Sequence, residues 1–154
     1  MNANNNYTQK LRKCLAFLAL AFVPAMMTAA QKETTLFAYG FAASFNDSTV
    51  YFTDVQQIDK AWADSKTGFL YSRDNYSYQL RENLQARGIQ HPTCITVYGK
   101  TRKEVEKKYV NMKKRYTTNG RYDVKYIPSN EFRFEPIEPD DSEKAAANTK
   151  KKKK

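Results

Sequence analysis

Side chains that suit ligand binding are concentrated between residues 62 and 81, where aromatic and charged residues are interleaved. Aromatic faces stack on sugars, apolar side chains and bases, and an Arg pairs with carboxylates or phosphates. We predict that a ligand-binding surface is formed by Trp62, Tyr71, Arg73 and Tyr78. The alternative is that these aromatic side chains pack into the core and bind nothing.

A second candidate surface is the basic segment from Thr101 to Tyr116, which contains seven Lys and Arg residues and two Glu residues. Such an excess of positive charge favours contact with an anionic polymer, such as cell-wall glycan, lipid phosphates or nucleic acid. We predict that this contact is made by Arg102, Lys103, Lys107 and Lys114. The alternative is an ordinary solvated helix face.

The terminal lysines, residues 150–154, similarly suit an anionic membrane surface or a solubilising tail.

The sequence contains few of the residues that catalysis or metal binding requires. His91 is the only histidine, and Pro92 follows it directly, which disfavours both a histidine base and a histidine-based zinc site. Cys94 lies in a predicted strand and is interpreted as a small buried residue, although a Cys94/His91 pair is conceivable. We therefore predict a protein that is not an enzyme and that uses no cofactor and no metal. A catalytic use of Asp64, Asp74 or the Cys94/His91 pair is a further alternative.

The first thirty residues have the layout of a secretory signal peptide. Three basic residues precede an apolar run from Leu15 to Val23, Pro24 ends the run, and Thr28-Ala29-Ala30 offers small residues at a cleavage site. The apolar run is too short to span a bilayer, which takes roughly 20 residues. We predict a signal peptide over residues 1–30, cleaved near Ala30. The mature chain then has no transmembrane span and is secreted or periplasmic.

The mature chain divides into one folded domain and a tail. Without the three basic residues of the leader, 23 Lys and Arg remain against 16 Asp and Glu, a net charge of +7. Cys94 is then the only cysteine, so no intramolecular disulfide can form and the core must stabilise the fold. Pro136, Pro139 and the lack of apolar periodicity predict a disordered, Lys-rich tail over residues 138–154. We predict a single domain over residues 31–137.

The elements of this domain are clearest between Thr93 and Ile127. Residues 93–98 are rich in β-branched and aromatic side chains, which predicts a strand. Thr101 and Glu104 form a capping box that begins a helix. One apolar stripe of this helix contains Val105, Tyr109, Met112 and Tyr116. Asn119-Gly120 ends the helix, and residues 122–127 alternate as a closing strand.

A hairpin and a first helix are predicted upstream. Residues 35–45 and 49–58 alternate with a period of two around a turn at 46–48, which predicts two antiparallel strands. A long loop follows from Asp59 and holds the predicted ligand-binding residues, with a short helical turn at residues 60–65 as an alternative. Asp74 or Ser77 caps a helix that ends in a Schellman motif at Gly88-Ile89. Its apolar stripe contains Tyr76, Leu80 and Leu84.

These elements give the order β-β-α-β-α-β, with a short fifth strand or an extended arm at Phe132 and Phe134. Each amphipathic helix has one apolar stripe to bury, and one face of a mixed sheet can cover both stripes. We predict an α/β (α+β) fold. It is a two-layer sandwich in which two helices lie on one face of a mixed four- to five-stranded sheet.

The stretch from Cys94 to Ile127, with its strand, Gly99, basic amphipathic helix and closing strand, resembles one half of the sporulation-related (SPOR) modules that bind peptidoglycan. A full module has the order β-α-β-β-α-β, whereas this chain opens with a hairpin, so membership is not inferred. The resemblance implies a cell-wall glycan as ligand.

The sequence favours a small exported accessory protein of the bacterial envelope that binds a partner without catalysing a reaction. A peptidoglycan-binding module is one alternative. A basic nucleic-acid-binding protein is another, favoured by the sequence pI near 9.5 and by the interleaved aromatic residues, and it requires that the leader is not cleaved. The partner on either candidate surface can also be a protein.

Overall fold

The structure, a computed structural model, describes residues 31–44 and 46–141. The predicted signal peptide and most of the predicted tail lie outside these residues. The described part contains β1 (Gln31–Ala43), β2 (Thr49–Thr53), β3 (Gln56–Asp64), α2 (Arg73–Ala86), β4 (Thr93–Gly99), α3 (Arg102–Thr117) and β5 (Asp123–Ile127). None of its helices is long and apolar enough to cross a membrane. The predicted class, an α+β protein with a mixed five-stranded sheet and two helices, is confirmed.

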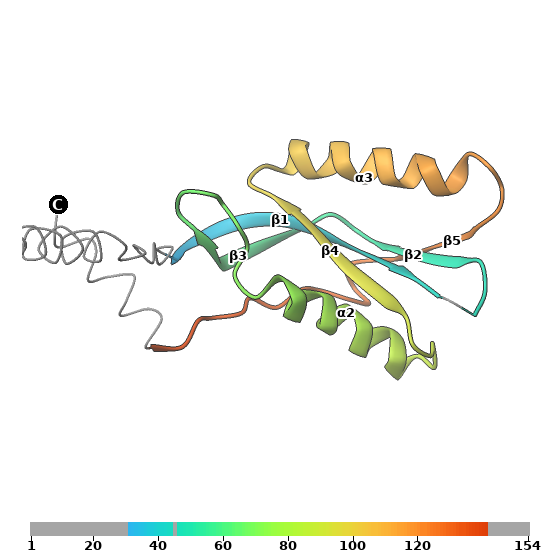
Figure 1. Cartoon of the computed structure of the whole chain (residues 1–154), viewed down its shortest axis with the longest axis horizontal. Coiled ribbons are helices and arrows are strands. Elements are labelled where there is room, and N and C mark those ends of the chain that lie inside the picture. The colour runs from blue at the N-terminus through green and yellow to red at the C-terminus, as the bar shows by residue number, and fades with distance from the viewer. Residues whose placement is uncertain (1–30, 45, 142–154) are drawn as a thin grey trace, which may run out of the picture.

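β1 is the central strand of the sheet (Figure 1). One edge of β1 pairs antiparallel with β4, and Tyr39 lies opposite Val97. The other edge pairs antiparallel with β2 and then with β3, which follow one another along β1. β5 lies parallel to β2, and Phe52 is opposite Tyr126. Among the described strands, β4 pairs with β1 alone, so its outer edge has no strand partner.

The predicted hairpin is confirmed, but the predicted strand over residues 49–58 is divided into β2 and β3. The element order is therefore β-β-β-α-β-α-β and not β-β-α-β-α-β. β3 continues to Asp64, and Trp62 pairs with Glu33 near the start of β1. The predicted long loop after Asp59 is therefore wrong, as is the alternative of a helical turn, because only residues 65–72 separate β3 from α2. The reason is that residues 31–34 lengthen β1 and provide the backbone partner for β3. The side-chain pattern around Trp62 does not reveal this distant pairing.

The two helices pack against opposite faces of the sheet, which corrects the prediction that they share one face (Figure 1). Successive side chains of β1 point to opposite faces. One face belongs to the apolar cluster that contains the α2 residues, and its members from β1 are Leu36, Ala38 and Ala42. The other face belongs to the cluster that contains Val105 of α3, and its members from β1 are Tyr39 and Phe41. Because β1 is apolar on both faces, it needs cover on both.

The small side chains on one face of β1 bring α2 close to the sheet. A Cβ atom added at Gly40 would lie 2.6 Å from Cδ2 of Leu80, so this close approach depends on glycine. The predicted apolar stripe of α2 is confirmed, because Tyr76, Leu80 and Leu84 are fully buried.

The predicted stripe of α3 is also confirmed. Val105 is fully buried, and Tyr109, Met112 and Tyr116 are half-buried against the aromatic side chains of β1 and β2. The hydroxyl of Tyr39 donates to Sδ of Met112 at 3.6 Å, and burial raises the pKa of Tyr39 to about 12.

The predicted helix ends are partly confirmed. The side chain of Thr101 accepts a hydrogen bond from the N–H of Glu104, as a capping box requires. The Glu104 carboxylate reaches back to the N–H of Lys100 instead of Thr101. At the end of α2, the N–H of Ile89 donates to the carbonyl of Leu84, which confirms the Schellman motif.

The predicted start of α2 is wrong. The helix begins at Arg73, and Ser72 precedes it without a capping hydrogen bond from its side chain. Neither Asp74 nor Ser77 is the cap. The Ser77 hydroxyl is instead 3.0 Å from that of Thr96, so this polar pair joins α2 to β4.

After β5 the chain forms an extended arm that closes the core beneath α2. Phe132 and Phe134 are buried there, which confirms the arm rather than a fifth strand at this position. The buried Gln56 side chain donates to the carbonyl of Phe132 at 2.8 Å and accepts from the N–H of Phe134 at 3.0 Å. Further along, the N–H of Ile137 donates to the hydroxyl of Tyr76. The arm is therefore held by both apolar and polar contacts.

Candidate binding groove

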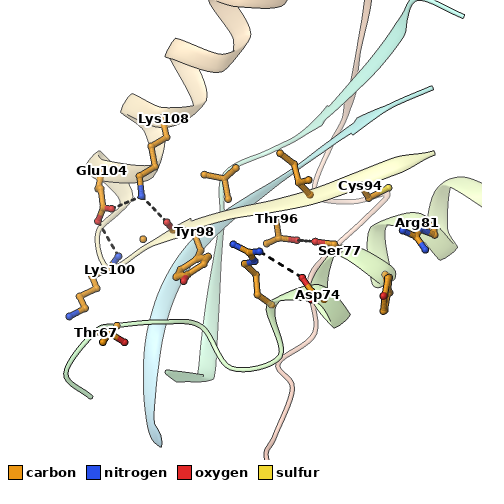
Figure 2. A pocket seen from close by; sticks show the side chains of 16 residues that line it. Thr67, Asp74, Ser77, Arg81, Cys94, Thr96, Tyr98, Lys100, Glu104 and Lys108 are labelled. Carbon is orange, nitrogen blue, oxygen red and sulfur yellow. Dashed lines mark hydrogen bonds and ion pairs between the residues drawn. The ribbon is translucent and has the colours of Figure 1, made fainter. Parts of the chain in front are cut away.

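A groove of about 810 Å³ follows the outer edge of β4 (Figure 2). Residues 94–99 form its base. One wall comes from α2 and the turn before it, and the other from Lys100 and the first two turns of α3. We call this feature the edge groove. It lies where two helices on opposite faces of a sheet leave the edge of a strand open between them.

The wall formed by α2 combines aromatic and cationic side chains. Tyr78 is 45% exposed, and the guanidinium of Arg81 lies 4.8 Å from the centre of its ring. Nε of Arg81 is buried and has no hydrogen-bond partner among the described residues. The guanidinium of Arg73 lies 3.9 Å from Oδ1 of Asp74, and the two side chains are 47% and 81% exposed. This wall therefore combines an exposed aromatic ring with two guanidinium groups.

The opposite wall is held in place by hydrogen bonds at the start of α3 (Figure 2). The Lys108 ammonium donates to Glu104 at 2.6 Å and to the carbonyl of Tyr98 at 3.0 Å. The hydrogen bond from the Lys108 side chain is the main reason that the pKa of Glu104 lies below its usual range. A Cβ atom at Gly99 would lie 2.7 Å from Oε2 of Glu104, so glycine lets this carboxylate approach β4 closely.

The edge groove carries more positive than negative charge. Its four cationic residues are Arg73, Arg81, Lys100 and Lys108, and its two carboxylate residues are Asp74 and Glu104. Because the groove excludes part of the solvent, its charges act on a bound group more strongly than they would on an open surface. The groove is therefore suited to a ligand with negative charge.

Asp64 shapes the turn that closes one end of the groove. Its carboxylate Oδ1 accepts hydrogen bonds from the hydroxyl and N–H of Thr67, each at 2.6 Å, and from the N–H of Lys66 at 3.1 Å. These bonds, above all that from the Thr67 side chain, hold the pKa of Asp64 below its usual value of 3.8. The ionised carboxylate thus positions Thr67 and Gly68, which line the groove.

We expect Asp64→Asn to destabilise the protein more at neutral than at acid pH. Because folding lowers the pKa of Asp64, the carboxylate stabilises the fold above its unfolded-state pKa of 3.8, and this stabilisation is lost as the pH falls further. Urea unfolding midpoints of Asp64→Asn and of the wild type should therefore converge between about pH 5 and about pH 2. Asp140→Asn, at an exposed carboxylate, is the charge-matched control. A difference of equal size throughout this range would contradict the assigned role.

Cys94 and His91, the pair considered for catalysis, lie in different surroundings. Cys94 is buried, and burial raises the pKa of its thiol to about 11, so the thiol is protonated at neutral pH. His91 is exposed in a turn with a φ of 52°. No group of three or more metal-ligating His, Cys, Asp or Glu side chains occurs in the described part of the chain.

The four predicted ligand-binding residues separate into two pairs. Arg73 and Tyr78 line the edge groove. Trp62 and Tyr71 do not, because Trp62 lies on β3 and is half-buried. The N–H of Tyr71 donates to the carbonyl of Trp62 at 2.8 Å, which ties this segment to β3.

The four predicted cationic contacts are all exposed on α3, but none of them lines the edge groove. Arg102 pairs with Glu106 at 3.3 Å and lies over the ring of Phe37. Lys103 and Lys107 lie on the solvent side of the helix. Lys114 lies beside a shallow depression near the end of α3. These residues form an exposed basic face separate from the groove.

Sequence reasoning did not select three of the groove cations, Arg81, Lys100 and Lys108. Glu104 and Lys108 are four residues apart on the predicted helix, a spacing that favours an ion pair at its start. This spacing could have identified Lys108 as a side chain held in place by Glu104. Arg81 belongs to the interleaved stretch of residues 62–81 but was not assigned to the predicted ligand surface, and Lys100 carried no signal. Only the packing of α2 beside β4 brings both residues to one groove.

The chain matches no protein-family model, no curated protein and no solved structure. The resemblance of residues 94–127 to half of a peptidoglycan-binding module therefore stays a prediction.

Proposed function

We propose that this protein is a non-enzymatic binding protein of the bacterial envelope, secreted or periplasmic, and that it binds an anionic partner in the edge groove. The observation that carries the proposal is the excess of cations along a groove whose base is an unpaired strand edge. Polar backbone groups can form hydrogen bonds with an acidic ligand, and the cations can pair with its negative charge. The export of the protein rests on the sequence of residues 1–30.

Two further observations support binding over chemistry. Arg73 and Arg81 place two guanidinium groups in the lining of the groove, and guanidinium groups pair with carboxylates and phosphates. The buried thiol of Cys94 is protonated at neutral pH, so the most nucleophilic kind of side chain in the groove is inert. The groove thus offers positive charge, hydrogen-bond donors and a concave surface to a ligand.

The test compares two double variants with the same change in net charge. Arg73→Glu/Lys100→Glu reverses two cations of the groove, and Lys103→Glu/Lys107→Glu reverses two cations of the exposed α3 face. Retention is measured on three immobilised baits: purified peptidoglycan, anionic lipid vesicles and detergent-solubilised envelope proteins. We expect the groove variant to lose at least about tenfold in affinity on one bait, equivalent to ~1.4 kcal/mol, while the control stays close to wild type.

The alternative results identify the alternative surfaces. Equal losses in both variants would mean that net charge alone drives binding, and a loss confined to the control would place binding on the α3 face. Either result, or equal retention of all proteins on every bait, would overturn the proposal. Raising the salt concentration should weaken the wild-type interaction, because exposed charge pairs are screened.

A further inference from the structure

The direction of the backbone groups in β1 follows from hydrogen bonds on its β2 side. The N–H of Gly40 donates to Oγ1 of Thr53 at 2.8 Å, and the N–H of Ser44 donates to the carbonyl of Thr49 at 3.2 Å. Even-numbered residues of this part of β1 therefore direct their backbone groups toward β2. Because these groups alternate along a strand, the odd-numbered residues direct theirs toward β4.

The register between β1 and β4 then identifies the groups that line the groove. Gly40 lies opposite Thr96, so the N–H and carbonyl of Thr96 point away from β1. The same holds for Cys94 and Tyr98, two residues away on either side. The carbonyl of Tyr98 confirms this direction, because it accepts a hydrogen bond from Lys108 across the groove. The backbone groups of Cys94 and Thr96 form the ladder positions that an added strand would use.

The side chains around this edge alternate in chemistry. On the face covered by α2, Cys94 and Thr96 are buried beside Arg73 and Arg81 of the groove wall. On the face toward α3, Ile95 is 41% exposed and Val97 is half-buried. Directly opposite residues of paired strands point to the same face. An added strand would therefore place every second side chain near arginines and the others near apolar surface.

Charge favours an acidic segment over a second copy of the chain as the occupant of this edge. A second copy of the chain, pairing through its own β4, would bring another set of the same cations to the groove, and like charges oppose such pairing. A segment with acidic side chains on its α2-facing positions would meet Arg73 and Arg81 instead. Its other side chains would cover Ile95 if they are apolar.

We propose that the edge groove binds an extended polypeptide segment, with acidic residues alternating with apolar ones, which adds to β4 as a further strand of the sheet. This inference rests on the proposed function and names the ligand class of the same groove. Backbone hydrogen bonds to Cys94 and Thr96 supply affinity, and the cations and Ile95 supply specificity. The guanidinium of Arg81, which lies over the ring of Tyr78 in the groove wall, receives an acidic side chain.

The probe is a peptide of about nine residues in which Glu and Val alternate, long enough to cover the seven residues of β4. We expect it to bind the mature chain with a dissociation constant below about 1 mM, and the same peptide with Lys in place of Glu to bind at least about tenfold more weakly. Amide hydrogen exchange gives the structural readout. Binding should slow exchange at Thr96 by about tenfold or more and leave Val97, already paired with β1, nearly unchanged.

N-methylation of the probe provides the matched control. Methyl groups on every second amide remove either the N–H groups that face β4 or those that face away from it. We expect one methylated peptide to lose at least about tenfold in affinity and the peptide methylated on the other set to stay within about twofold. Equal effects of the two sets, no added protection at Thr96, or no binding of the unmodified probe at 1 mM would each overturn strand addition.

The outcome separates this inference from the proposed function. If Arg73→Glu/Lys100→Glu reduces retention on an envelope bait but the probe shows no strand addition, the groove binds another anionic ligand and only the inference fails. If the groove variant behaves like wild type on all baits and the probe also fails, both are overturned.

Discussion

We expect Phe134→Ala to lower the free energy of unfolding by about 3–5 kcal/mol, the usual cost of truncating a large aromatic side chain in a core. Phe134 is 7% exposed, and its ring packs against Tyr76 at 6.0 Å and Phe132 at 4.9 Å between ring centres. Its para carbon (Cζ) is also one of the atoms nearest to the position of a Cβ at Gly40. Removing the ring would therefore open a cavity between the C-terminal arm, α2 and β1.

Equilibrium urea unfolding, followed by circular dichroism, measures this loss. Arg133→Ala is the control, because Arg133 is the exposed neighbour of Phe134 on the same arm. We expect the control to change the free energy of unfolding by less than about 1 kcal/mol. A loss of less than about 1 kcal/mol for Phe134→Ala would mean that the arm does not belong to the core.

Phe52→Ala should cost a similar amount, about 3–5 kcal/mol, on the opposite face of the sheet. Phe52 is fully buried in β2, and its ring contacts Phe41, Tyr109 and Tyr116 in edge-on or near edge-on geometry. Such pairs contribute beyond the apolar area that they bury. Truncation therefore removes the centre of the aromatic cluster that joins α3 to β1 and β2.

The control for Phe52 is Tyr126→Ala, at the residue opposite Phe52 on β5, which is 48% exposed. We expect the Tyr126 variant to lose at most about half as much stability, because its ring is only partly removed from water. Urea unfolding of both variants measures the difference. Equal losses of stability in the two variants would contradict the structure, in which α3 covers Phe52 and excludes it from solvent.

Local sequence patterns determined the elements that depend on short-range physics. Thr101 and Glu104 marked the start of α3, and the Schellman pattern at Gly88-Ile89 marked the end of α2. The apolar stripes of both helices were correctly predicted because a 3.6-residue period is visible within one segment. The hairpin followed from alternation on either side of a turn.

Predictions that depended on distant pairing were less successful. The segment around Trp62 looks like a loop because its apolar pattern is short, yet residues 31–34 of β1 pair with it and extend it as β3. Half of the candidate ligand-binding set therefore lies away from the groove. Arg73 and Tyr78 both line the groove because both lie on α2. In the sequence, only their short separation along the chain indicated that they belong to one surface.

The sequence by itself determined which residues form two amphipathic helices and which alternate with the period of a strand. Only the tertiary structure decided that the two helices pack on opposite faces of β1. Both faces of β1 are apolar, and the sequence of neither face indicates which helix will cover it. The same arrangement leaves the outer edge of β4 open and gathers Arg73, Arg81, Lys100 and Lys108 beside it. Helical and strand periods are local properties of a chain, whereas a groove between elements depends on how apolar faces are paired over long distances.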